Sequence, residues 1–282
     1  MYELSVKNDR GELLSLPSNV NYNVIKIEGL NPPPATINMS ANTTMDGSSV
    51  NATKLESRNL VIYVVIEGDI EANRIQLYNY FPIKKTVTLY YSNGTRDVYI
   101  EGVVELIECD LFSNRQVAQI SLICPNPYFK DVEFVVTNFS EISSEFEFPF
   151  SIAESGIAFS EITQNIRKSI VNASDVETGV EITLYATGTV VNPVIYDVMR
   201  RTHMRLNFTM LTSDTVVINT NAGEKSITLI RSGVSSNALG YLQQDSSWFT
   251  LLSGDNVFAY DAESGISDLQ LTFKANILYS GV

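Results

Sequence analysis

Residues 117–129 read VAQISLICPNPYF, and this stretch constrains the fold more than any other part of the chain. Ile120 and Leu122 belong to an apolar run that is typical of a half-buried strand. Pro125 and Pro127 end that strand, because a proline ring cannot donate to a sheet ladder and holds the residue before it in an extended conformation. The stretch therefore predicts a strand at the edge of one domain, followed by a stiff exit into another.

The length and composition of the chain fit two mainly β domains. At 282 residues the chain is too long for one ordinary domain, so we expect domains at residues 1–130 and 131–282. Charged residues make up only 18% of the sequence, which leaves a surface rich in Asn, Ser and Thr, as in turn-dense β architecture. No apolar run approaches a membrane span and the N-terminus lacks a signal-peptide pattern, so we expect synthesis in a cytoplasm and no membrane insertion.

The chain is strongly acidic, with 32 acidic and 19 basic residues and a net charge of −13. A protein that neutralises phosphates needs a basic face, so the charge argues against nucleic-acid binding. Solubility is one explanation of the acidity. The other is an acidic channel past which DNA slides without sticking.

The first half contains one predicted helix among its strands. Asn59–Glu67 is almost continuously apolar, which predicts a strand buried on both faces. Asp69 is a good N-cap for a helix that Pro82 ends. Asn93-Gly94 lies between two strand-like runs and predicts a tight hairpin. The apolar residues at helical spacing are Ile70, Leu77, Tyr78 and Phe81.

Residues Ala35–Ser57 carry few large apolar side chains and cannot bury much area of their own. Two structures remain open: a mobile loop, or a hairpin arm that packs on a neighbouring copy. A two-stranded ribbon is marginal in isolation, and one such contact repeated between copies generates a closed ring. The candidate contact residues at the turn are Thr44, Met45, Asp46 and Gly47, of which Asp-Gly is a tight-turn signal.

The second half is almost entirely strand-like. Apolar residues alternate in EFEFPF at 145–150 and with strict period two at the last strand. Short strands separated by turn residues such as Asn221-Ala222-Gly223 predict a sandwich or jelly roll. The alternating residues of the last strand are Leu269, Leu271, Phe273, Ala275 and Ile277.

No credible active site is found, and we expect neither enzymatic activity, nor a metal, nor a cofactor. His203 is the single histidine and lies in a predicted strand, without any G-x-S-x-G element. Glu145 and Glu147 face one side of a strand opposite the phenylalanines, as a solvated face does. Cys109 and Cys124 lie near the ends of candidate paired strands, where both a disulfide and two small core thiols remain open.

Trp248 is the only tryptophan and admits two interpretations. A lone ring in a sandwich invites stacking on a sugar. The local alternative is a core-edge cluster of Trp248, Phe249 and Leu251, ahead of a tight turn at Gly254. We favour the structural role.

The order of short motifs along the chain resembles the distal tail proteins of siphophages. In the first half the resemblance includes Arg58-Asn59-Leu60, Phe81-Pro82-Ile83-Lys84 and the exit at residues 123–129. In the second half it includes Phe146–Phe150, Ala186–Pro193, Asp214–Gly223 and a W-x-x-L-x-x-G-x-N pattern from Trp248 to Asn256.

This resemblance implies a structural hub of the virion tail tip. It predicts a β-sandwich-like belt domain with one helix and a hairpin arm around residues 35–57, and a galectin-like sandwich or jelly roll after it. Six belt domains would form a ring through which DNA passes without specific binding. The implied partners are the other copies, the tail tube protein, a tail-associated lysin or fibre protein, and a receptor-binding protein or host glycan.

Two other function classes remain open. One is a carbohydrate-binding protein that adheres to the host surface through its second domain. The other is an enzyme with an unrecognised pair of carboxylates, of the kind glycoside hydrolases hold ~5–9.5 Å apart. A phage-tail-like bacteriocin would show the same motifs as an infectious phage.

Overall fold

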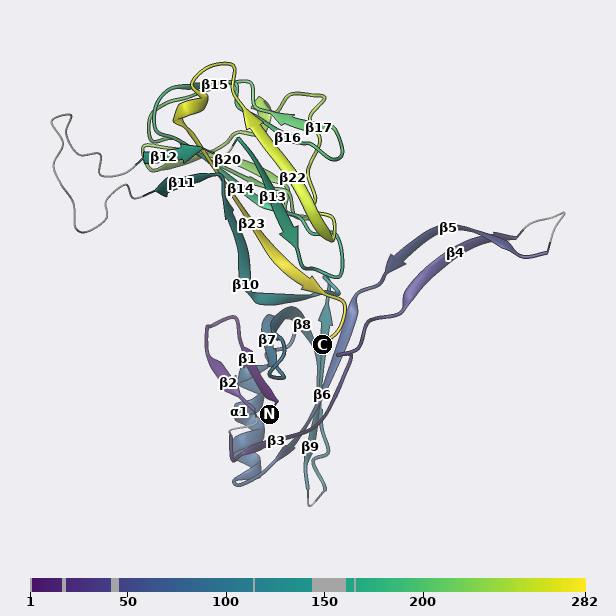
Figure 1. Cartoon of the computed structure of the whole chain (residues 1–282). Coiled ribbons are helices and arrows are strands. Elements are labelled where there is room, and N and C mark those ends of the chain that lie inside the picture. The colour runs from purple at the N-terminus through teal and green to yellow at the C-terminus, as the bar shows by residue number, and fades with distance from the viewer. Residues whose placement is uncertain (1, 17–18, 42–45, 114, 144–160, 165) are drawn as a thin grey trace, which may run out of the picture. The chain divides into compact units, whose positions relative to one another are not determined.

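The computed structural model describes residues 2–16, 19–41, 46–113, 115–143, 161–164 and 166–282. The described chain is mainly strand, with one α-helix (Figure 1). Its contacts divide it into two compact units, Met1–Val132 with Leu278–Val282, and Glu133–Ile277. Residues 278–282 thus group with the first unit by their contacts, whereas the domains expected from the sequence were 1–130 and 131–282.

The first unit contains most of the long strands. They are β1 (Glu3–Lys7), β2 (Leu13–Ser15), β3 (Tyr22–Glu28), β4 (Ala35–Ala41), β5 (Ser48–Leu55), β6 (Arg58–Ile66), β7 (Thr86–Ser92), β8 (Asp97–Cys109) and β9 (Val117–Cys124), together with the start of β10 (Phe129–Asn138). β8 belongs to two series of antiparallel neighbours, β2-β1-β7-β8 and β8-β9-β6-β3. A register shift between Val104 and Leu106 interrupts its pairing with β9, as a β-bulge does.

The helix α1 (Ile70–Tyr80) begins and ends where the sequence predicts. The Asp69 carboxylate accepts a hydrogen bond from the Ala72 backbone N–H at 3.3 Å, which satisfies one of the free N–H groups of the first turn. Leu77 and Phe81 are fully buried in the core of the first unit, beside Ile62 and Val64 of β6. The apolar stripe of the helix therefore packs on the strands.

The second unit is a sandwich of two sheets. In the larger sheet the order of neighbours is β10-β23-β14-β19-β20-β21, and in the smaller it is β13-β22-β16-β17. The strands of the larger sheet are β14 (Glu181–Ala186), β19 (Thr215–Asn219), β20 (Ser226–Arg231), β21 (Val234–Asn237) and β23 (Leu269–Tyr279). Those of the smaller sheet are β13 (Arg167–Asn172), β16 (Val194–Asp197), β17 (Thr202–Arg205) and β22 (Gly254–Asp261). Two short pairs, β11 (Ser140–Ser143) with β12 (Glu161–Gln164) and β15 (Val190–Val191) with β18 (Thr209–Met210), and the 3-10 turns η1 (Leu239–Tyr241) and η2 (Ile266–Asp268), complete the unit.

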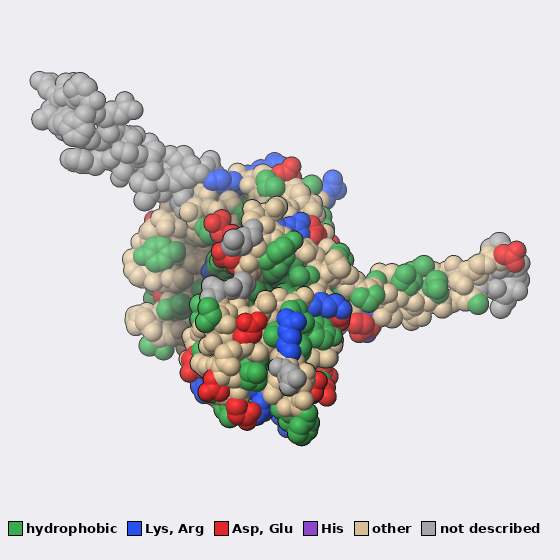
Figure 2. Space-filling model, turned by 90° about the horizontal axis from the view of Figure 1, so that it is seen from below, with side chains coloured by type: hydrophobic (Ala, Val, Ile, Leu, Met, Phe, Trp, Pro, Cys, Tyr) green, Lys and Arg blue, Asp and Glu red, His purple; other side chains and the backbone are tan. Residues whose placement is uncertain are grey.

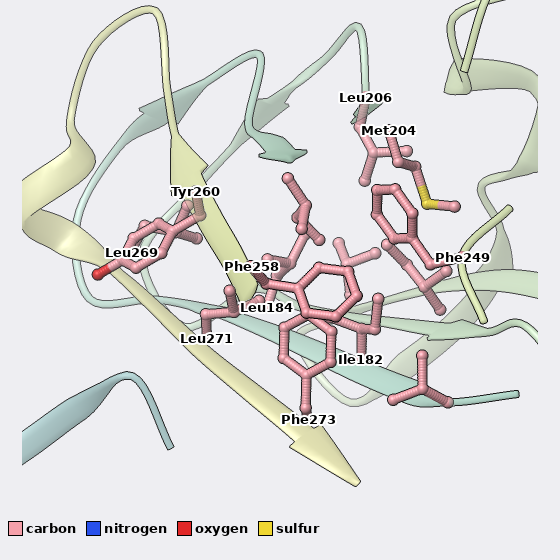
Figure 3. Packing of buried hydrophobic residues seen from close by; sticks show 14 of the residues in the cluster. Ile182, Leu184, Met204, Leu206, Phe249, Phe258, Tyr260, Leu269, Leu271 and Phe273 are labelled. Atoms are coloured by element: carbon pink, nitrogen blue, oxygen red, sulfur yellow. The ribbon is translucent and has the colours of Figure 1, made fainter. Parts of the chain in front are cut away.

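The core of the second unit lies between these sheets. Figure 3 shows Ile182 and Leu184 of β14 and Phe273 of β23 directed toward Phe258 of β22. The Phe258 and Phe273 ring centroids are 4.8 Å apart. The period-two alternation of β14 and β23 produces this arrangement, because successive side chains of a strand point to opposite faces.

The predicted turns also form. β7 and β8 are joined at Asn93-Gly94, where the Asn93 side chain accepts from the backbone N–H groups of Thr95 and Arg96 and Gly94 has φ +82°. The mainly β fold is therefore confirmed. The alternating phenylalanines at 146–150, with Glu145 and Glu147, lie outside the described residues.

Candidate assembly surfaces

β4 and β5 form a separate two-stranded ribbon beyond the ends of β3 and β6 (Figure 1). The predicted hairpin therefore forms, and the mobile-loop alternative is wrong for the described part of this segment. Asp46 and Gly47 lie just before β5, and Gly47 has φ +99°, a backbone conformation that favours glycine. Thr44 and Met45 lie outside the described residues.

The ribbon has one apolar face, made by alternation and by one bulge. Residues opposite each other in an antiparallel pair share a face, so Ile37 lies with Thr53 and Met39 with Val50. The register shifts by one residue at Asn51, and without this shift Asn51 itself would lie opposite Met39. Figure 2 shows hydrophobic side chains exposed along the ribbon.

The other face of the ribbon is polar. The Asn51 amide donates to the Ser40 hydroxyl at 2.5 Å, and the Thr36 hydroxyl donates to Glu56 at 3.1 Å. The Lys54 ammonium lies 3.1 Å from the same Glu56 carboxylate and, by its hydrogen bond, lowers the pKa of that group. The polar groups of this face can be solvated by water, whereas the opposite face exposes apolar side chains.

A second feature of the first unit is a clasp around the last residues of the chain. Arg58, at the start of β6, is only 2% exposed, and its guanidinium donates to four backbone carbonyls from three different segments. Those acceptors are Pro127 at 2.7 Å, Asn31 at 2.8 Å, Ser280 at 2.6 Å, and Gly29. The guanidinium also lies over the Phe129 ring, 4.5 Å from its centroid. Burial lowers the pKa of Arg58.

Arg96 extends the clasp. It donates to the Gly281 carbonyl at 2.5 Å and lies over the Tyr279 ring, 4.1 Å from its centroid. The Tyr279 hydroxyl donates to the Asp131 carboxylate at 2.9 Å, and the Val282 N–H donates to the Leu30 carbonyl at 3.1 Å. These contacts explain why residues 278–282 belong to the first unit.

Trp248 lies beside the core of the second unit. Its ring is partly buried against the apolar cluster, and the Lys225 ammonium lies 5.5 Å from the ring centroid. Downstream, Asn256 is buried, and its side chain bonds the Leu252 N–H and carbonyl and the Gly254 carbonyl. The tryptophan motif thus ends in a turn fixed by the Asn256 amide.

The histidine and the two cysteines, the remaining candidates for a reactive or metal-binding site, lie apart and do not form a cluster among the described residues. His203, in β17, has its imidazole 3.6 Å from Asp245, and no group of three or more His, Cys, Asp or Glu among the described residues could hold a metal ion. Cys109 lies opposite Ala118 of β9, whereas Cys124 is six residues further along that strand, about 20 Å away at the usual strand rise. That distance exceeds disulfide reach, so the two thiols stay free within one chain. No helix in the described ranges has the length and apolar character needed to cross a membrane.

Comparison with known proteins finds a family match within the second unit. Residues 173–276 match the protein family described as siphovirus-type tail component, C-terminal domain. This match lies within the second unit, Glu133–Ile277. The resemblance to siphophage distal tail proteins that the sequence motifs indicate is therefore confirmed. A search of curated protein sequences finds no match.

Solved structures share the fold of this chain over nearly its whole length. One is the Dit protein of phage SPP1, described as a paradigm of the hub adsorption apparatus in phages that infect Gram-positive hosts; it has a TM-score of 0.69 and 12% identity over 98% of each chain. Another is a chain of the phage P2 baseplate in its activated conformation with Ca, with a TM-score of 0.57 and 11% identity over all of both chains. At such identities the likeness shows the fold.

Sequence reasoning missed two features of the first unit. The alternation of Ala35, Ile37 and Met39 was a readable signal for an apolar face on the ribbon. No local signal marks Arg58 as a buried clasp, because its acceptors come from three segments far apart in the sequence.

Proposed function

We propose that this chain is a hub subunit of a phage or phage-like tail tip, and that six copies form its ring. The observation that carries the proposal is the apolar face of the β4–β5 ribbon. Ile37, Met39 and Val50 are 52%, 57% and 60% exposed, although they lie together on one face. A second copy of the chain is the occupant that would cover this face.

The energetics favour contact with a neighbour. A two-stranded ribbon is marginal in water, and every described residue of β4 and β5 except Leu55 is exposed. Full burial of a large apolar side chain stabilises by about 1.5–3 kcal/mol, so covering three half-exposed ones contributes roughly 3 kcal/mol per ribbon. The same ribbon on each copy, packed on the next copy, makes a heterologous contact that closes into a ring.

The test uses two matched variants of the full chain. Ile37→Ser, Met39→Ser and Val50→Ser together remove the apolar face, whereas Asn38→Ser and Ser49→Thr change only the polar face. Mass photometry and negative-stain microscopy should show six-fold rings for the wild type and the polar-face variant, and monomers for the apolar-face variant. Rings from all three proteins, or monomers from the wild type at high concentration, would refute the proposal.

The charge distribution supports passage of DNA through such a ring without specific binding. The first unit carries 15 acidic and 11 basic residues, whereas residues 133–277 carry 17 and 8. Most of the net negative charge therefore belongs to the second unit, and the first stays weakly negative. A ring whose bore is lined by Lys and Arg would contradict this part of the proposal.

The position of such a hub in the virion implies its partners. One face of the ring would meet the tail tube protein and the other a tail-associated lysin or fibre protein, with the second units available to a receptor-binding protein. Pull-down of purified tail tube protein by the wild type, and its loss with the ring-deficient variant, is the expected result.

A further inference from the structure

The outer face of the larger sheet in the second unit has no role in the proposed ring. Along β14, Ile182 and Leu184 point into the core, whereas Thr183 and Tyr185 point to the opposite face. β19, β20 and β23 alternate in the same way. One face of this sheet is therefore the core wall and the other meets water.

Strand register places the outer side chains in rows across the sheet. Thr272, Thr183, Val217, Thr228 and Asn237 are direct neighbours on successive strands from β23 to β21. The adjacent row consists of Gln270, Tyr185, Thr215, Ile230 and Ser235. Hydroxyl and amide groups dominate both rows, and an aromatic ring lies near their middle.

The geometry points to a binding site for a neutral oligosaccharide on this face. Tyr185, which is 37% exposed, would stack its ring on a sugar. Thr183, Thr215 and Gln270 surround it at neighbouring positions and would exchange hydrogen bonds with sugar hydroxyls. From β14 to β21 the sheet extends three strand spacings, about 14 Å, which is room for more than one sugar ring.

An open depression in the surface at the β20–β21 end of the rows supports this assignment. Its volume is about 350 Å³, and Ser226, Thr228, Ser235 and Asn237 help to line it. Within the described part of the chain, the hydroxyls of Ser226, Thr228 and Ser235 have no protein hydrogen-bond partner. They are therefore free to bond a ligand.

Charge selects the class of saccharide. Residues 133–277 carry 17 acidic and 8 basic residues, so an anionic glycan would be repelled by the unit as a whole. On the outer face itself, Glu181 and Lys274 are direct cross-strand neighbours of opposite sign. A neutral, hydroxyl-rich ligand fits this balance.

Tyr185 replaces Trp248 as the candidate stacking residue. One region of the Trp248 ring packs on the core and another lies near the Lys225 ammonium. Tyr185 is not engaged in this way and stands among open hydroxyl groups.

The experiment measures glycan binding by the full chain and four variants. A glycan array of neutral glucose, galactose, rhamnose and N-acetylglucosamine oligosaccharides identifies the sugar that binds. Titration calorimetry with a trisaccharide of that sugar then gives the affinity. Tyr185→Ala should lower the affinity at least about tenfold, whereas Tyr185→Phe keeps the ring and should stay within about twofold. Tyr196→Ala is the matched control, because Tyr196 is 39% exposed on β16 of the other sheet, and Trp248→Phe tests the earlier candidate.

Three results would overturn the inference: no neutral glycan bound by the wild type, unchanged affinity of Tyr185→Ala, or a larger loss in Tyr196→Ala or Trp248→Phe than in Tyr185→Ala. Near-ultraviolet circular dichroism checks that each variant is folded. Ring formation is scored separately with the ribbon variants, so failure here leaves the proposed hub function standing.

Discussion

The Arg58 clasp gives a prediction whose magnitude follows from the structure. Arg58→Met keeps a long apolar stem beside Phe129 but removes the guanidinium and with it the hydrogen bonds to the carbonyls of Gly29, Asn31, Pro127 and Ser280. Hydrogen bonds to charged groups contribute about 1.5–3 kcal/mol each but are not additive, and opening a buried charged network costs about 3–5 kcal/mol. We expect the free energy of unfolding of the first unit to fall by about 3–5 kcal/mol.

Urea unfolding can assign this loss to the correct unit. Trp248, the only tryptophan, lies in the second unit, so its fluorescence follows that unit, whereas far-ultraviolet circular dichroism follows both. The Arg58→Met transition should move to lower urea by circular dichroism and stay unchanged by fluorescence. Arg10→Met is the control, because the Arg10 side chain is 54% exposed and such surface contacts contribute only about 0–1 kcal/mol. A loss for Arg58→Met no greater than for Arg10→Met would refute the reasoning.

Two further predictions concern buried ionisable groups. Asp214 is 1% exposed and accepts hydrogen bonds from Arg231, which lower the pKa of its carboxyl. The stability that this interaction contributes is complete above the ordinary Asp pKa of about 3.9 and is lost as the pH falls through the lowered pKa. Asp214→Asn should therefore lose about 2 kcal/mol at pH 7 and flatten the acid decline of the Trp248 urea midpoint, and parallel pH curves for both proteins would contradict this. Burial raises the pKa of the Cys124 thiol to about 12 and also raises that of the half-buried Cys109, so iodoacetamide at pH 8 should label Cys109 first and Cys124 only in denaturant. Equal labelling of the native protein in mass spectrometry is the result that would exclude this difference.

Local chemistry was enough to predict most of the individual elements. Asp69 and Pro82 define the ends of α1 because capping and the missing proline N–H act within a few residues. Asn93-Gly94 forms its hairpin for the same local reason, and the alternation from Leu269 onward predicts a strand with one buried face. These signals predicted a mainly β chain, whereas for residues 35–57 they left a loop and a hairpin arm both open.

The sequence predicted only part of the apolar face of the β4–β5 ribbon. Ile37 and Met39 alternate in the sequence, but Val50 lies on the same face only because of the bulge at Asn51. No turn or composition signal in the sequence predicts this bulge. The proposed sugar face likewise depends on register, since Tyr185 and Gln270 are 85 positions apart and meet only because β14 pairs with β23.

The amino-acid order alone therefore established the strands, the helix and the tight turns, since each depends on interactions between residues close along the chain. Tertiary structure alone decided the path of the last five residues, the clasp of Arg58 and the separation of the two cysteines. These depend on which distant backbone carbonyls and strands come together, and burial makes each such polar group require a partner. A short stretch of sequence carries no information on which distant group becomes the hydrogen-bond partner of a buried polar group.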